Sequence, residues 1–554
     1  MLQNTGTPSL RLPRTGLPKN LRVFFVILLV LGVFFRFVNL DKKVYWHDET
    51  FTSLRASGYT EAEAVQQLSN ANVISIETLQ QYQRPNFERG LSDTLKSLAV
   101  EDTQHPPLYY AIASFWIRWF GSSVTAMRSL SVLFSLLALP SIYWLCLELF
   151  ESSLTGWVAV GLIAVSPYQV MFAQEARQYS LWAMTILLSS AALLRAMRLS
   201  NKVNWGIYAV TLAASLNTFL FSGLVAIGHG IYVVMIERWR WSKTLRAYLL
   251  ASLLGFIGFL PWTLVLIFNL SQAQKTTAWL GNKMTLFSLM REWALNLSRV
   301  FIDWYYTSAD PSISKILFYL VSLALVALVG YSFYFLYRHT PERIWLFLLT
   351  LVGVTAVALI VPDVITGGQR SVIHRYSVAC YLGIQLAVAH LIASKIIGIS
   401  SNIWQHKLWQ LVMLLLFSSG VVSCALSSQA EVWWLKDYNG ANPAVARLVN
   451  QASRPLVISD GQMADILSLG YYLNPNVQLL LRPKCYTCDL KSQSGNTPYI
   501  PKISENFSDV VLFHPRYSEE WLQGLKQQKI YQIKPLVSDV IEPFDDLLWR
   551  LEKL

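Results

Sequence analysis

The fold depends on how one stretch of the chain is interpreted: LYYAIASFWIRWF, at residues 108–120. It is as apolar as a membrane helix, but it has only 13 residues and contains Arg118. A helix needs about 20 residues to cross a hydrocarbon core of about 30 Å. We therefore interpret this stretch as an interfacial or re-entrant helix that does not span the membrane.

Longer apolar runs lie on both sides of it. Hydrophobic residues make up 54% of the 554 residues, which is more than a soluble domain can keep from water. The first run, at residues 23–40, is too long for a signal-peptide core, and no small-residue cleavage site follows it. It is therefore interpreted as an uncleaved signal anchor. We predict a mainly α, polytopic membrane protein with about eleven transmembrane helices, at residues 23–40, 125–149, 155–171, 180–197, 206–220, 222–236, 247–270, 316–337, 344–361, 376–395 and 408–427.

The distribution of basic residues supports this topology. Loops on the cytoplasmic side of membrane proteins are rich in Lys and Arg. Counting residues 108–120 as a span would move every dense basic loop to the outer side. We therefore predict a plasma (inner) membrane protein with a cytoplasmic N-terminus, and attribute the net charge of +12 to topology rather than to nucleic-acid binding. The loops concerned contain Arg195, Arg198, Lys202, Arg238, Arg240, Lys243, Arg246, Arg338 and Arg343.

Three regions follow from this topology. Residues 1–20 form a basic tail, and residues 21–428 form a transmembrane domain with outer loops at 41–124 and 271–315. Residues 429–554 are predicted to be a small extracytoplasmic α/β domain, because strand-like runs alternate with helical patterns there. The strand-like runs are 455–460, 477–481 and 510–514, and the helical patterns are 443–452, 462–473 and 519–527.

The five cysteines are sparse. Cys485 and Cys488 form a single C-x-x-C, whereas a zinc site usually has two such pairs, so a local disulfide is favoured. Cys146, Cys380 and Cys424 lie in apolar runs and are predicted to be buried.

Two polar motifs lie in the first predicted outer loop, at residues 41–124. In YWHDET, at residues 45–50, Asp48 and Glu49 are candidates for a general base or for metal ligands. The alternative is a helix start, with Asp48 as the N-cap and Glu49 in the first turn. In HPPLYY, at residues 105–110, His105 is predicted at the membrane lip; the alternative is a rigid entry turn with a solvated histidine.

Two further motifs lie between later spans. FAQEARQY, at residues 172–179, places Glu175 and Arg177 close to the bilayer, where charges usually pair or act, although an interfacial belt is the alternative. PDVITGGQR, at residues 362–370, is followed by HRY at 374–376. Cations on the outer side are suited to an anionic lipid headgroup, because guanidinium groups bind phosphate bidentately. The alternative is a belt of snorkelling arginines.

Together these motifs resemble those of the GT-C glycosyltransferases, over about residues 20–430. Within that superfamily the chain is similar to the bacterial family 39 branch, akin to protein O-mannosyltransferases and the lipid A aminoarabinose transferase. The resemblance implies Asp48 as the base, with Glu49 in the second acidic position. It implies donor phosphate binding by Arg370, His374, Arg375 and Tyr376; substrate contacts by His105, Tyr109, Glu175, Arg177 and Tyr179; and, as an open possibility, a divalent metal at His47, Glu49, His105 and Glu175.

The expected function is transfer of a sugar from a polyprenyl-phosphate-linked donor to an acceptor at the outer face of the membrane, by inverting displacement. The acceptor stays open between lipid, glycan and protein, and no cofactor is certain. The main alternative is a lipid or lipid-linked sugar transporter (a flippase), which predicts charges deep within spans and two related halves. A non-catalytic envelope scaffold and an O-antigen polymerase or ligase are further alternatives.

Overall fold

The computed structural model describes residues 18–70, 72–304, 312–397, 403–488, 507–514, 531–535 and 548–553. The chain divides into two compact units, each built from separate stretches of sequence. The first, which we name the membrane unit, comprises Met1–Val38, Arg128–Leu264 and Thr277–Gln429. The second, the mixed unit, comprises Asn39–Met127, Val265–Thr276 and Ala430–Leu554.

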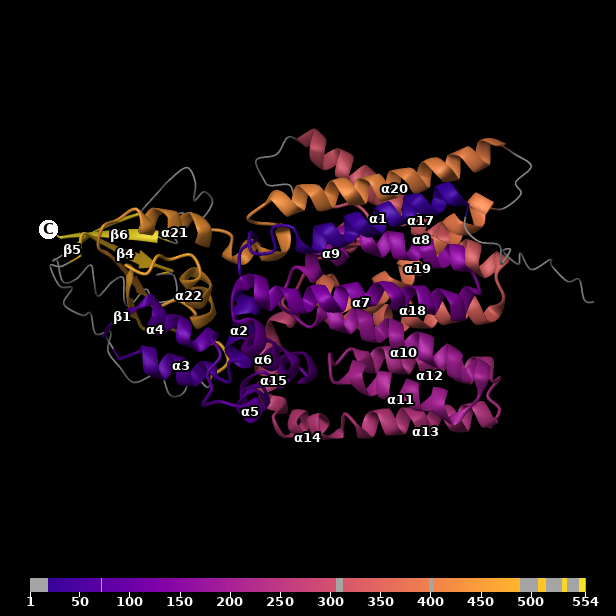
Figure 1. Ribbon diagram of the computed structural model, residues 1–554, viewed down its shortest axis with the longest axis horizontal. Helices are drawn as coiled ribbons and strands as arrows, with labels where there is room; N and C mark the ends of the chain where they lie inside the picture. Colours follow the sequence, from indigo (N-terminus) through magenta and orange to yellow (C-terminus); the bar gives the residue numbers. More distant parts are fainter. Residues whose placement is uncertain are drawn as a thin grey trace, which may run out of the picture. The chain divides into compact units, whose positions relative to one another are not determined.

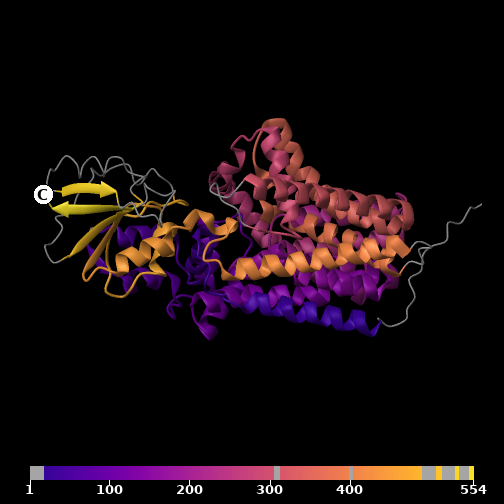
Figure 2. The ribbon, with the colours of Figure 1, turned by 90° about the horizontal axis from the view of Figure 1, so that it is seen from above.

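Helices make up the membrane unit, and the long ones run side by side along roughly one direction (Figures 1 and 2). They are α1 (Lys19–Phe37), α7 (Val124–Phe150), α8 (Ser153–Ala164), α9 (Pro167–Ala173), α10 (Tyr179–Leu199), α11 (Lys202–Leu216), α12 (Ser222–Ile236), α13 (Lys243–Ile257), α14 (Leu260–Phe268), α16 (Leu286–Ser298), α17 (Ser312–His339), α18 (Glu342–Thr366), α19 (Val378–Ile397) and α20 (Ile403–Gln429). Short 3₁₀ turns, η2 (Ala278–Gly281), η3 (Arg370–Val372) and η4 (His374–Ser377), complete the unit.

Seven of the described helices are long and apolar enough to cross a membrane, or nine if two bent pairs, α8 with α9 and α13 with α14, each count as one span. The prediction of a mainly α, multi-pass membrane protein is confirmed, but the number eleven is not. The two remaining predicted spans correspond to α11 and α12, which have 15 residues each. At 1.5 Å per residue such a helix is about 22 Å long, which is less than the thickness of the hydrocarbon core.

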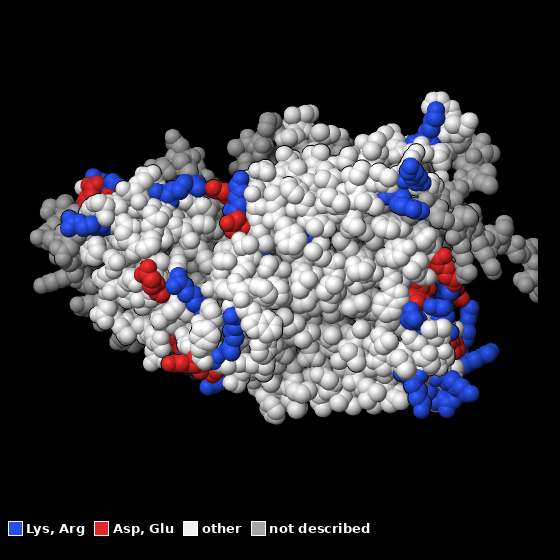
Figure 3. Space-filling model, in the orientation of Figure 1, with Lys and Arg blue, Asp and Glu red and all other residues white. Residues whose placement is uncertain are grey.

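Basic loops meet at one end of the membrane unit, as the charge pattern predicts. The loops joining α10 to α11 and α12 to α13 lie at the same end (Figure 1), and Lys and Arg side chains gather there on the surface (Figure 3). Ion pairs connect neighbouring loops at this end: Arg238 with Glu342 at 2.6 Å, and Arg343 with Glu151 at 2.5 Å. That this end faces the cytoplasm remains a prediction.

The mixed unit consists of a sheet and short helices. The helices are α2 (His47–Ala56), α3 (Glu61–Leu68), α4 (Ile76–Gln80), α5 (Leu91–Glu101), α6 (Leu108–Phe120), α15 (Leu270–Thr277), α21 (Asn442–Asn450) and α22 (Met463–Gly470). The strands, β1 (Val73–Ser75), β2 (Pro455–Ser459), β3 (Gln478–Leu481), β4 (Asp509–Phe513), β5 (Tyr531–Pro535) and β6 (Leu548–Lys553), pair in the order β1-β3-β2-β4-β6-β5. The three central strands are parallel and the outer pairings are antiparallel.

The predicted α/β fold of the C-terminal region is confirmed. The three strand-like runs match β2, β3 and β4, and two helical patterns match α21 and α22. The third helical pattern, residues 519–527, lies outside the described residues, as do Arg11 and Arg14 of the predicted basic tail. The predicted non-spanning helix at 108–120 is α6, which is not among the candidate spans.

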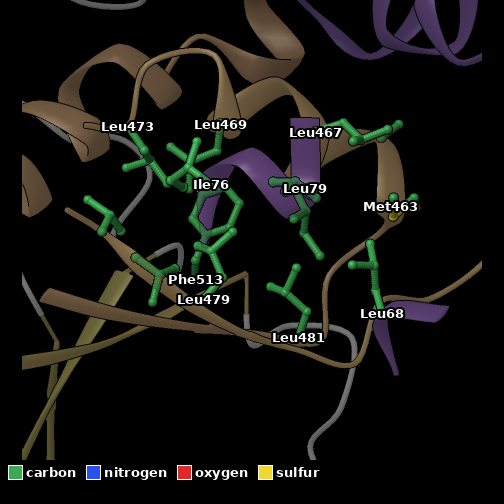
Figure 4. Close-up of a cluster of buried hydrophobic side chains, with 14 of the residues drawn as sticks. Leu68, Ile76, Leu79, Met463, Leu467, Leu469, Leu473, Leu479, Leu481 and Phe513 are labelled. Atoms are coloured by element: carbon green, nitrogen blue, oxygen red, sulfur yellow. The ribbon is translucent and has the colours of Figure 1, made fainter. Parts of the chain in front are cut away.

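The division before this region falls at 429/430, within one residue of the predicted 428/429, but residues 430–554 belong to the same compact unit as Asn39–Met127 and Val265–Thr276. Strand β1, from the first long loop, extends the C-terminal sheet by pairing antiparallel with β3. A shared apolar core explains the association: Ile76 and Leu79 of α4 pack with Leu467 of α22 and Leu479 of β3 (Figure 4). The two stretches bury each other's apolar side chains, so neither has a complete core alone.

The cysteines agree with their sequence predictions. Cys485 and Cys488 form a disulfide. Cys146, Cys380 and Cys424 are buried.

Candidate active site

The YWHDET motif begins helix α2 of the mixed unit. The N-cap of α2 is Trp46, so the prediction that Asp48 is the N-cap is wrong. Asp48 and Glu49 instead lie in the first turn, where the positive end of the helix dipole favours negative charge. The helix starts two residues earlier than the alternative interpretation requires, because His47 already has helical geometry.

Glu49 is held by a lysine that the motifs did not indicate. Its carboxylate Oε2 lies 2.6 Å from the Lys436 Nζ, and both side chains are fully buried. Lys436 is 387 positions away in the sequence, in a segment without a recognisable motif. Glu49 is therefore charge-compensated inside the mixed unit.

His47 faces a second buried carboxylate. Its Nδ1 is 3.6 Å from the Asp465 Oδ1, and Asn439 joins the two by accepting the His47 backbone N–H at 2.8 Å and donating to Asp465 at 3.1 Å. Burial alone would lower the pKa of His47, but hydrogen bonding and attraction to Asp465 raise this pKa above its ordinary value. Burial likewise opposes ionisation of Asp465, whereas His47 holds the pKa of Asp465 below its ordinary value.

The predicted metal ligands in the mixed unit do not fit a divalent cation as they lie. The Glu49 carboxylate binds an ammonium group and the His47 imidazole faces Asp465. Among the described residues, the three side chains whose ligand atoms gather within 4.8 Å are Glu61, Cys485 and Cys488, two of which are joined as a disulfide. We derive no chemical step through a metal.

The HPPLYY motif forms the start of helix α6. Pro107 is the N-cap of α6. The His105 backbone N–H donates to the Asp102 carbonyl, and the Asp102 carboxylate is 2.7 Å from the buried guanidinium of Arg55. The imidazole of His105 is partly exposed, whereas Tyr109 is fully buried, with its ring 5.8 Å from that of Tyr110.

The QEARQY residues of the membrane unit are buried. The structure gives exposures of 0% for Glu175 and 4% for Arg177, unlike the side chains of a lipid-facing belt. Gln174 donates to the carbonyls of Phe35 and Val38 at 2.9 and 3.0 Å, which satisfies the end of helix α1. These hydrogen bonds attach the short turn between α9 and α10 to the end of α1.

Aromatic side chains join this segment to the predicted phosphate-binding residues. The Phe172 ring lies 5.0 Å from Tyr179 and 5.6 Å from His374. The Tyr168 hydroxyl donates to the His374 carbonyl at 2.9 Å. Within the membrane unit, the structure therefore brings together two motifs that are about 200 residues apart. Tyr376 packs nearby against Phe221, at 4.9 Å between ring centroids.

Arg370 is oriented by a buried aspartate. Its Nη1 is 3.0 Å from the Asp363 Oδ1, and the other Asp363 oxygen accepts the backbone N–H and hydroxyl of Ser371, both at 2.7 Å. The Arg370 side chain remains 34% exposed. Gly368, with φ of +143°, allows this pairing, because a Cβ there would overlap both the guanidinium and the carboxylate.

Arg375 lies beside aromatic rings. Its guanidinium is 5.9 Å from the ring centroids of Trp279 and Tyr376. Gln369 ties the same loop to η2 through hydrogen bonds to Trp279 and Leu280 carbonyls, at 2.9 and 3.0 Å. The sequence does not mark Trp279 as a functional residue, because aromatic residues at a membrane interface are common and carry no specific signal.

The family model for dolichyl-phosphate-mannose-protein mannosyltransferases matches residues 104–265. This part of the chain contains both HPPLYY and QEARQY. The predicted family resemblance is confirmed. The match to the mannosyltransferase model covers less than a third of the chain, and the acidic loop and the Arg370 loop lie outside it. No curated protein matches the whole sequence closely enough to count as a relative.

Several solved structures match this chain at low identity. ArnT from Cupriavidus metallidurans bound to undecaprenyl phosphate is 14% identical and aligns over 97% of this chain and 98% of its own, with a TM-score of 0.48. Its apo structure is 13% identical over 96% and 98%, with a TM-score of 0.48. The archaeal oligosaccharyltransferase AglB from Archaeoglobus fulgidus, in complex with an inhibitory peptide and a dolichol-phosphate, is 12% identical over 97% and 75%, with a TM-score of 0.48.

Proposed function

We propose that this membrane protein transfers a sugar from a polyprenyl-phosphate carrier to an acceptor at the outer face of the plasma (inner) membrane. The observation that carries the proposal is the mannosyltransferase family match over residues 104–265. The membrane-spanning helices are compatible with a donor that stays in the bilayer. The sugar and the acceptor class, whether lipid, glycan or protein, are left open in this proposal.

The proposed chemistry is a direct displacement at the anomeric carbon. An acceptor hydroxyl or amine forms the new bond to that carbon, its proton passes to the base, and the bond to the carrier phosphate breaks with its electron pair on the phosphate oxygen. Asp48 is the proposed base, since its neighbour Glu49 is committed to Lys436. A single displacement inverts the anomeric configuration, and phosphate leaves without a general acid.

Cationic residues of the Arg370 loop are proposed to stabilise the phosphate as its charge grows. Arg370 is held by Asp363 while a third of its side chain stays exposed. A guanidinium oriented in this way can donate hydrogen bonds to the phosphate without first rearranging. Arg375, His374 and Tyr376 are proposed to complete the contact with the carrier. Glu175, Arg177 and Tyr179, with His105 and Tyr109, remain proposed substrate-contacting residues.

A transfer assay with the purified protein in lipid nanodiscs tests the proposal. Labelled polyprenyl-phosphate sugars and nucleotide sugars are compared, with envelope extract as the acceptor. We expect transfer from the lipid-linked donor alone, and Asp48→Asn to lower the rate by about 10² to 10⁴. Asp41→Asn is the matched control, because Asp41 is an exposed aspartate of the same loop.

Two results would contradict this function. Retention of the anomeric configuration in the product would exclude a single displacement. Movement of the lipid-linked sugar across the bilayer, without transfer from any donor, would favour the transporter instead.

A further inference from the structure

The YWHDET motif is held along its length by one C-terminal segment. Hydrogen bonds or ion pairs join four of its six residues, 45, 47, 49 and 50, to residues between 436 and 472. These contacts lie on both sides of Asp48. We name the segment Lys436–Tyr472 the clamp.

The first contacts fix the backbone in front of Asp48. The Tyr45 backbone N–H donates to the Tyr472 hydroxyl oxygen at 2.7 Å, and the Tyr45 carbonyl accepts from the Ser468 hydroxyl at 2.6 Å. The Tyr45 ring also packs on that of Tyr471, at 4.5 Å between centroids. Because the backbone N–H and the carbonyl of Tyr45 are both hydrogen-bonded to the clamp, the chain cannot shift here without losing both bonds.

Asn439 fixes the first residue of helix α2. Its side-chain oxygen accepts the His47 backbone N–H at 2.8 Å, and its amide donates to Asp465 at 3.1 Å. Asp465 is buried and faces the His47 imidazole. Asn439 therefore holds both the backbone N–H of His47 and the carboxylate that faces the His47 ring.

The remaining contacts lie directly after Asp48. Lys436 binds Glu49 at 2.6 Å, and the Thr50 hydroxyl lies 3.3 Å from the Ala464 carbonyl. Rigid placement of a reacting group matters because a displacement of about 1 Å can lower a rate by about 100-fold.

We propose that the clamp is part of the active site, and that Asn439 and Asp465 are positioning residues that hold Asp48 in place for the reaction. This inference rests on the proposed function. It assigns a role to the C-terminal region: the region supplies the acidic loop with its supports. A chain with an intact Asp48 and a loosened clamp therefore binds the lipid-linked donor but turns it over slowly.

The test is Asn439→Ala in the full-length protein in nanodiscs, with Asn86→Ala as the matched control. Asn86 is an asparagine of the same unit that also accepts a backbone N–H, from Glu88, and donates through its amide, to the Tyr59 hydroxyl; neither contact involves residues 45–50 or the clamp. We expect Asn439→Ala to lower kcat by about 10- to 100-fold with the donor KM within about twofold, and Asn86→Ala to leave kcat within about twofold. Equal kcat losses in the two variants would overturn the proposal.

Hydrogen exchange gives a second readout that needs no catalysis. In Asn439→Ala the amides of residues 45–50 should exchange faster than in the wild type, while those of residues 108–120 stay unchanged. Asp465→Asn, which keeps the shape of the side chain, should give the same pattern with a smaller effect. Unchanged exchange at residues 45–50 in both variants would refute the clamp. Wild-type protein that transfers no sugar would instead refute the proposed function, and the exchange data would still test the clamp.

Discussion

Replacement of Lys436 by methionine tests how much the buried ion pair between Lys436 and Glu49 stabilises helix α2. Both side chains of the pair are fully buried, and the nitrogen and oxygen are 2.6 Å apart. Methionine keeps an unbranched chain of similar length, so the change removes the charge with little loss of packing. Removing one partner of a buried pair costs about 3 to 5 kcal/mol, because the remaining charge loses its counterion inside the protein.

Native-state hydrogen exchange measures this loss where it occurs. Each 1.4 kcal/mol corresponds to about a tenfold change in an equilibrium constant, so the amides of α2 should exchange at least about 100-fold faster in Lys436→Met. In the double variant Lys436→Met with Glu49→Gln, most of the loss should be recovered, because no buried carboxylate is left without its ammonium partner.

A matched exposed pair provides the control. Arg447 and Glu431 are 3.0 Å apart, with 54% and 48% of their side chains exposed. Such pairs contribute about 0 to 1 kcal/mol, so Arg447→Met should change exchange by less than about fivefold. If Lys436→Met has an effect as small as Arg447→Met, the argument that Glu49 is committed to Lys436 fails.

Three further substitutions have defined outcomes. Arg36→Met should lower the free energy of unfolding by about 3 kcal/mol or more, seen as a lower melting temperature in nanodiscs, because the buried guanidinium donates four hydrogen bonds, three of them to backbone carbonyls. Gly368→Ala should raise the KM for the lipid-linked donor by about tenfold, since the new methyl group displaces Arg370 from Asp363. An unchanged KM would show that the Arg370–Asp363 pair does not contribute to donor binding. Cys485→Ser should lower the melting temperature by the equivalent of about 2 kcal/mol, the value for closing a loop with a sequence separation of 3; an equal melting temperature under reducing and oxidising conditions would contradict it.

Much of the fold was predictable because its signals are local. Apolar length identifies the long helices, and basic loops identify the end at which they meet. The strands β2, β3 and β4 are recognisable as short apolar runs bounded by polar residues. In contrast, β1 has only three residues, and its pairing partner β3 lies about 400 positions further along the chain. No local pattern marks such a pairing, so the sequence predicted a separate C-terminal domain where the structure has a shared sheet.

The candidate site was predictable to a similar degree. The motifs identify Asp48, Glu49 and the cationic loop, and family resemblance gives them roles. Their partners could not be predicted, because Lys436, Asn439 and Asp465 lie in a segment with ordinary composition and no motif. Asp48 and Glu49 are adjacent acidic residues in the sequence, and no motif indicates that Glu49 contacts Lys436.

Two of the charged pairs, Glu49 with Lys436 and Asp363 with Arg370, have a common physical explanation. Glu49 and Asp363 are both completely buried, and a buried carboxylate is stable only with a cation and hydrogen bonds around it. Glu49 has a buried cation and is removed from solvent, whereas Asp363 has a cation that is one-third exposed and can still meet a ligand. A guanidinium has five donors, so Arg370 can bind Asp363 through Nη1 and present the rest of its planar group to a phosphate. Both carboxylates are paired, so it is the exposure of the cation that distinguishes Arg370, which can bind a ligand, from Lys436, which is buried. Sequence motifs do not contain this exposure.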